Sequence, residues 1–203
     1  MKQLAATRPV FHSEADFQFA FGRALSQLQP EIHVRMEVPR RRRDTGRSEY
    51  LDLLALGPKG STAIELKYPT AAWSGRLSVA PGVEEQFQLR SHAAMDLARL
   101  YFVHDIVRLE QAEVATHGLA ILLTNARDLW QPRVGKKPTR DEAFRVHEGQ
   151  RLAGQLTWGS GDYAKNDHSL AGAYVMSWRD YSEPGGVNGC FRWLGVETTS
   201  ASS

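Results

Sequence analysis

Residues 50–68 read YLDLLALGPKGSTAIELKY, and this sequence predicts a β-hairpin. Two runs rich in apolar side chains, 50–56 and 62–68, flank the turn Gly57-Pro58-Lys59-Gly60. With the turn centred on Pro58-Lys59, each residue of the first strand faces one of the second. The predicted pairs are Leu54 with Ala63, Leu53 with Ile64, Asp52 with Glu65, and Leu51 with Leu66. Because cross-strand neighbours share a face of the sheet, this register places the two carboxylates side by side.

The carboxylates of Asp52 and Glu65 predict a site for a divalent cation. Two carboxylates left unpaired in a mostly apolar sheet cost several kcal/mol or take up a proton. Mg²⁺ and Mn²⁺ relieve that cost because they prefer carboxylate and carbonyl oxygens. Lys67 shares the face of Glu65, since alternate strand residues point the same way, and its ammonium can bind a phosphate oxygen or orient a water. The alternative for this Glu-x-Lys tripeptide is an ion pair at a sheet edge.

Lysine at position 67 is notable because the chain has nineteen arginines and only six lysines. An ammonium is a compact charge whose pKa responds to its surroundings, which a guanidinium cannot match. Glu14 is a second candidate, since it shares the helical face of Phe17 and Phe21, where a carboxylate is unexpected. It is interpreted either as an outer metal ligand or water anchor, or as a charge that stabilises the helix N-terminus.

The remaining sequence predicts an α/β fold. Ser13 begins a helix that ends before Pro30, and residues 32–38 alternate as a strand that ends at Pro39. The later expectations are an irregular segment at 69–82, a long helical stretch from about 83 to about 114, an apolar strand at 118–124, a helix at 139–152, strands at 171–178 and 191–196, and a frayed tail after Glu197. The chain thus divides into a core at 1–124 and a C-terminal α+β extension at 125–203, packed on the same domain.

Charge is nearly balanced overall but unevenly distributed. The net charge is +2, yet six arginines fall between Arg35 and Arg47, and seven Arg or Lys residues between Arg127 and Arg151. Such patches fit a phosphate backbone, or they are solvated surface runs. The arginines predicted to contact phosphates lie in the loop before the hairpin: Arg40, Arg41, Arg42, Arg43 and Arg47. Trp73, just past Lys67, is a candidate to stack on an unpaired base or to close the edge of the core.

Cys190 is the only cysteine, which excludes a disulfide framework and a thiolate metal cluster. The N-terminus, MKQLAATRPV, lacks the charged start and apolar run of a signal peptide. The longest fully apolar run, 119–123, is far too short to cross a bilayer. We therefore expect a soluble cytoplasmic protein with no membrane partner.

The order helix, strand, strand, strand, helix, strand, with Asp52 before Glu65-Leu66-Lys67 on a hairpin and Glu14 on the first helix, resembles the PD-(D/E)XK nuclease superfamily. That group includes restriction endonucleases and Holliday-junction resolvases. The resemblance covers about residues 13–124, and leucine stands before Asp52 where the motif has proline. It implies a restriction-endonuclease-like αβββαβ core with a central mixed sheet flanked by helices.

By that resemblance, Asp52 and Glu65 ligate Mg²⁺, for which Mn²⁺ can substitute, together with the backbone carbonyl of Leu66. Lys67 positions the attacking water, and Glu14 matches the acidic residue of the first helix.

Many members of the superfamily also carry a glutamine on the helix after the third strand, a place that Gln86 or Gln88 would fill. The expected activity is metal-dependent hydrolysis of phosphodiester bonds in nucleic acid, DNA rather than RNA. One rival is a non-catalytic nucleic-acid-binding or assembly module with the same fold. Another is an enzyme for a small phosphorylated substrate, which needs an enclosed pocket instead of an open basic groove. The C-terminal third carries a specificity determinant, a homodimer surface, or neither.

Overall fold

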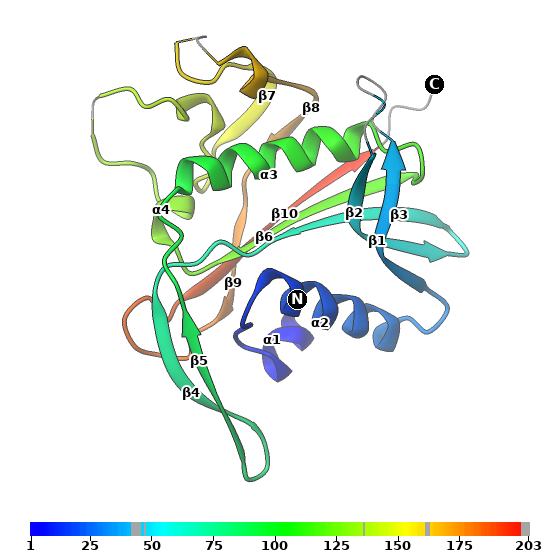
Figure 1. Cartoon of the computed structure of the whole chain (residues 1–203), viewed down its shortest axis with the longest axis vertical. Helices are drawn as coiled ribbons and strands as arrows, with labels where there is room; N and C mark the ends of the chain where they lie inside the picture. Colours follow the sequence, from blue (N-terminus) through cyan, green and yellow to red (C-terminus); the bar gives the residue numbers. More distant parts are fainter. Residues whose placement is uncertain (42–45, 47, 136, 161–162, 200–203) are drawn as a thin grey trace.

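The computed structural model describes residues 1–41, 46, 48–135, 137–160 and 163–199. Its centre is a six-stranded mixed sheet with strand order β1-β2-β3-β6-β10-β9. The strands are β1 (His33–Arg41), β2 (Ser48–Gly57), β3 (Gly60–Lys67), β6 (His117–Thr124), β9 (Trp178–Ser182) and β10 (Phe191–Thr199). β3 and β6 run parallel, whereas every other pair of neighbours is antiparallel. The predicted α/β fold with a central mixed sheet flanked by helices is therefore confirmed (Figure 1).

Helices cover both faces of this sheet (Figure 1). The helix α2 (Glu14–Leu28) begins as predicted, because Ser13 Oγ accepts a hydrogen bond from the backbone N–H of Asp16 at 3.2 Å. Its buried side chains form one core with the short helix α1 (Lys2–Thr7) and one face of the sheet. The helix α3 (Met95–Glu110) forms a second core with the opposite face. Alternate residues of β2 and β3 enter these two cores, as the pleat of a strand requires.

Residues 73–89 form a separate hairpin of β4 (Trp73–Ala80) and β5 (Val83–Leu89), which projects from the sheet (Figure 1). The prediction of an irregular segment followed by a helix from about 83 is therefore wrong for this region, and α3 starts only at Met95. Pro81 and Gly82 lie in the turn, where Gly82 has a φ of +72° that favours glycine. Phe87 and Leu89 are buried at strand spacing, so packing overrides the helix preference of Glu84 and Glu85 before them.

Residues after 124 complete the same sheet, because β10 pairs with β6 and β9 pairs with β10. The predicted helix at 139–152 is wrong: the segment has one 3₁₀ turn, η1 (Glu142–Phe144), and Gly149 has a φ of +75°, which a helix excludes. The predicted strand at 171–178 is divided between β8 (His168–Val175) and β9, and β10 continues to Thr199, past the expected start of the tail. The remaining elements are α4 (Arg127–Trp130), β7 (Arg151–Leu156), η2 (Ala164–Asn166) and β8 (His168–Val175), which pairs with β7.

None of the helices in the described part of the chain is both long enough and apolar enough to span a membrane.

Candidate metal and catalytic site

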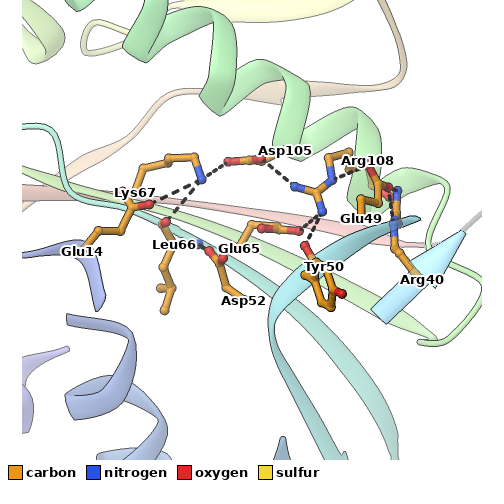
Figure 2. Close-up of polar contacts among 10 residues, drawn as sticks. All are labelled: Glu14, Arg40, Glu49, Tyr50, Asp52, Glu65, Leu66, Lys67, Asp105 and Arg108. Carbon is orange, nitrogen blue, oxygen red and sulfur yellow. Dashed lines mark hydrogen bonds and ion pairs between the residues drawn. The ribbon is translucent and has the colours of Figure 1, made fainter. Parts of the chain in front are cut away.

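The predicted hairpin register is confirmed from the turn to the pair Leu53 and Ile64, where the ladder between β2 and β3 ends. Beyond this pair, the Asp52 side chain takes the place of a backbone hydrogen bond of the ladder. Its Oδ2 accepts a hydrogen bond from the backbone N–H of Leu66 at 2.7 Å (Figure 2). The predicted pairing of Leu51 with Leu66 is wrong, since these side chains lie in cores on opposite faces of the sheet. Asp52 is thus held against β3 by a side-chain bond instead of by ladder pairing.

A local irregularity in β1 and β2 accounts for this change. The ladder between these strands pairs Met36 with Leu53 and Val38 with Leu51, and it omits Glu37 and Asp52 between them. Glu37 has a φ of +50°, in a region that residues other than glycine rarely adopt. Leu51 and Leu53 would share a face in a regular strand, yet they enter different cores. The irregular backbone at Glu37 therefore lies beside Asp52, the residue whose side chain turns toward β3. Strained backbone conformations are common at functional sites.

Glu65 is the most deeply buried carboxylate of the site, with 1% of its surface exposed. Arg108 Nη2 lies 3.2 Å from its Oε1, but neither carboxylate oxygen has a hydrogen-bond partner among the described residues. Burial, and after it the nearby Asp105 carboxylate, raise the pKa of Glu65 to about 9, while Arg108 opposes both. A buried carboxyl without hydrogen bonds is costly, and it identifies a position where a bound cation would stabilise the fold.

Lys67 follows on the same strand and is surrounded by acids (Figure 2). Its Nζ lies 3.1 Å from Asp105 Oδ2 and 3.9 Å from Glu14 Oε1, and it donates a hydrogen bond to the Leu66 carbonyl at 3.5 Å. Burial by itself lowers the pKa of Lys67, but the negative charges of Asp105 and Glu14 outweigh it and raise the pKa above the ordinary value. Lys67 is therefore a fixed cation of the site and does not serve as a proton acceptor at neutral pH.

Glu14 is the first residue of α2, which packs on the face of the sheet opposite α3, and it reaches the same cluster from there. Its Oε2 accepts a hydrogen bond from the backbone N–H of Tyr68 at 2.8 Å. Burial raises the pKa of Glu14, while the charge of Lys67 lowers it. The carboxylate therefore ties the helix to the end of β3, beside Lys67, in addition to any effect on the helix dipole.

Asp105 and Arg108 of α3 are site residues that sequence reasoning missed. Asp105 is 2% exposed and joins Lys67 to Arg108, whose Nη1 lies 3.5 Å from its Oδ1. Burial raises the pKa of Asp105, and Lys67 lowers it. Arg108 also donates to the backbone carbonyl of Tyr50 at 2.5 Å. The available signal was a carboxylate among the apolar residues Phe102, Val103 and Ile106, at an (i, i+3) spacing from an arginine.

The predicted phosphate-binding arginines fall into three groups. Arg40 makes contacts within the protein: it forms an ion pair with Glu49 and donates a hydrogen bond to the backbone carbonyl of Arg108 at 2.8 Å (Figure 2). It therefore helps to hold Arg108 in the site. Arg41 is exposed at the end of β1. Three others, Arg42, Arg43 and Arg47, lie outside the described residues. Contact of these arginines with nucleic acid stays a prediction.

Gln86 and Gln88 do not lie on a helix, because both belong to the hairpin strand β5. Gln86 Oε1 accepts a hydrogen bond from Arg76 at 3.5 Å, whereas Gln88 lines a cleft of about 700 Å³. Glu14 and Lys67 line the same cleft, so it opens directly beside the site. Trp73 is 4% exposed and packs against Phe191, which supports its role in the core and not in base stacking.

The predicted metal ligands offer two carboxylates and the Leu66 carbonyl, the oxygen donors that Mg²⁺ prefers. The orphaned oxygens of Glu65 fit a cation, and Asp52 acts electrostatically on Glu65 from nearby. In the described part of the chain, no group of three or more His, Cys, Asp or Glu side chains is arranged to hold a metal ion. A divalent cation here would therefore need backbone and solvent oxygens to complete its coordination.

Comparison with known proteins adds no relative: no family model matches the chain, and no curated protein or solved structure is significantly similar to it.

Proposed function

We propose that this chain is a Mg²⁺-dependent nuclease with a PD-(D/E)XK-type core, and that DNA is its substrate. The order α2, β1, β2, β3, α3, β6, with β3 parallel to β6, supports the αβββαβ core of that superfamily, once the inserted hairpin β4–β5 is set aside. The observation that carries the proposal is Glu65, a buried carboxylate without hydrogen bonds, next to Asp52 and Lys67 on one hairpin.

Asp52, Glu65 and the Leu66 carbonyl would hold the cation, which when bound polarises a phosphate and makes a water more acidic. Lys67 would orient that water and stabilise the negative charge that develops on phosphorus oxygens. Asp105 and Glu14 keep Lys67 charged and fix its position between them. Arg108 lies 3.2 Å from Glu65, limits its movement, and would balance its charge once a cation has displaced the proton. Asp105 and Arg108 are thus positioning residues.

The test is cleavage of linear, circular and single-stranded DNA, and of RNA, with Mg²⁺, with Mn²⁺ and with chelator. Glu65→Gln and Lys67→Ala should each reduce the rate on the order of 100-fold or more. Glu31→Gln and Lys59→Ala alter exposed residues and serve as matched controls. Absence of cleavage with every substrate and both metals would refute the proposal and favour a non-catalytic module.

A second candidate is hydrolysis of a small phosphorylated substrate, which the cleft favours because about 700 Å³ is typical of a ligand pocket. A nucleotide-sized phosphodiester distinguishes the two. Hydrolysis of this compound without cleavage of any polynucleotide would favour the second candidate.

A further inference from the structure

The cleft beside Lys67 has an apolar lining, which the charged backbone of a paired double helix would not contact. Its walls are mostly apolar, formed by residues such as Pro69, Leu89, Ala94 and Leu97. Glu14 and Lys67 contribute to its lining, and so do residues in the N-terminal half of α3. A concave apolar surface next to a charged site suits a flat, apolar group attached to a phosphate.

Two side chains of the cleft are free to meet such a group. Tyr101, on α3, lines the cleft and keeps 52% of its surface exposed. Arg90, at the end of the hairpin, also lines the cleft and is exposed. Its guanidinium makes no ion pair or hydrogen bond with any other residue that the structure describes. The cleft thus offers an exposed aromatic side chain and an uncommitted cation along the same lining as Lys67.

A nucleobase could stack on the aromatic side chain of Tyr101, and the phosphate of the same nucleotide could pair with the guanidinium of Arg90. Every base has a π-face that stacks on aromatic side chains, and arginine contacts phosphates without regard to sequence. A base inside a duplex, however, is stacked on both faces and reaches a protein pocket only when it is unpaired or flipped out. The apolar walls would therefore remain unused by a fully paired substrate.

We infer that the cleft binds an unpaired nucleotide next to the scissile phosphate, with its base on Tyr101 and its phosphate near Arg90. The inference rests on the proposed nuclease function, and it makes the substrate a single strand or a duplex with a single-stranded extension. The unpaired nucleotide can belong to DNA or RNA, since a stacking face does not distinguish them.

A binding measurement under conditions without cleavage tests this inference independently of catalysis. Fluorescence anisotropy with Ca²⁺ in place of Mg²⁺ would compare one blunt hairpin duplex, the same duplex with a single-stranded extension, and the extension alone. Each probe is made in DNA and in RNA, so that the comparison shows which nucleic acid supplies the bound nucleotide. The native protein should bind the two probes with unpaired nucleotides more tightly than the blunt duplex, on the order of tenfold.

Tyr101→Ala should remove that preference, and Tyr101→Phe should retain it because the ring is kept. Tyr163→Ala is the matched control, since Tyr163 is 54% exposed and does not line the cleft. Arg90→Ala should weaken binding of all probes with unpaired nucleotides, unlike Arg23→Ala on the exposed surface of α2. Ala at an exposed helix position leaves the fold intact.

Equal binding of blunt and extended probes, or an intact preference in Tyr101→Ala, would overturn the inference while the nuclease proposal stands on its cleavage assay. Failure to bind any probe, together with failure to cleave any substrate, would overturn both.

Discussion

Replacing Glu65 by glutamine should flatten the dependence of stability on pH. The carboxyl has an ordinary pKa of 4.5, and in the folded protein its pKa is raised to about 9 because it is buried beside Asp105. Between these two values the folded protein holds a proton that the unfolded chain has released. The free energy of unfolding of the native protein therefore falls as pH rises through this window. The glutamine substitution would remove this titration and keep the side-chain shape.

The magnitude follows from the number of protons that the two states bind. The pKa of Asp105 is raised only to about 6, so above pH 6.5 Glu65 is the main contributor of this pair. One proton gives a slope of about 1.4 kcal/mol per pH unit, or about 3 kcal/mol between pH 6.5 and pH 8.5. Groups remote from Glu65 are the same in both proteins and cancel in the comparison.

The assay is urea unfolding at several pH values in the presence of chelator, for the native protein and for Glu65→Gln. Glu31→Gln removes an exposed carboxylate and controls for the change in net charge. The difference in unfolding free energy between the native protein and Glu65→Gln should shift by about 3 kcal/mol across this range, in favour of the variant at high pH. A difference that stays constant with pH would refute the argument that Glu65 is held protonated by its surroundings.

Three further outcomes are expected. Asp141→Asn should lower the free energy of unfolding by about 3–5 kcal/mol in urea titrations, because the buried Arg99 and Arg145 lose their shared charged partner. Asp180→Asn is the control at a mostly exposed ion pair, and it should change the free energy of unfolding by about 1 kcal/mol or less. Mg²⁺ at pH 8.5 should raise the thermal midpoint of the native protein but not that of Asp52→Asn, and a midpoint that rises equally in both would place the ion elsewhere. Gly118→Ala should lower the free energy of unfolding by about 1–3 kcal/mol, since its methyl would meet the Thr198 hydroxyl and lie 2.7 Å from Leu109 Cβ; an unchanged urea midpoint would show that both neighbours yield.

The sequence predicted the centre of the fold because local chemistry and packing agree there. The turn at Pro58-Lys59 is flanked by strands that are apolar on both faces, as a central strand must be. The hairpin β4–β5 was missed because Glu84 and Glu85 favour a helix in isolation, and only the packing of Phe87 against His12 and Trp73 shows that the segment is a strand.

The candidate site divides in the same way. Glu65 and Lys67 could be predicted because they are two residues apart on one strand. Asp105 and Arg108 join them only through the packing of α3 on the sheet, a contact between segments far apart in the chain. The position of Asp52 depends on the backbone of Glu37 in a neighbouring strand, and a left-handed glutamate has no signature in sequence.

Helix α3 connects the site to the last third of the chain. At its start, Arg99 Nη1 donates to Asp141 Oδ2 at 2.6 Å, and at its end Glu110 accepts hydrogen bonds from the backbone of β8. Between these two anchors, Asp105 and Arg108 hold Lys67 and Glu65. A chain cut at residue 124 would retain every predicted site residue and lose both supports of the helix that arranges them. Inherited changes far from the hairpin, in the segment around Asp141 or in β8, can therefore tune the site without touching it.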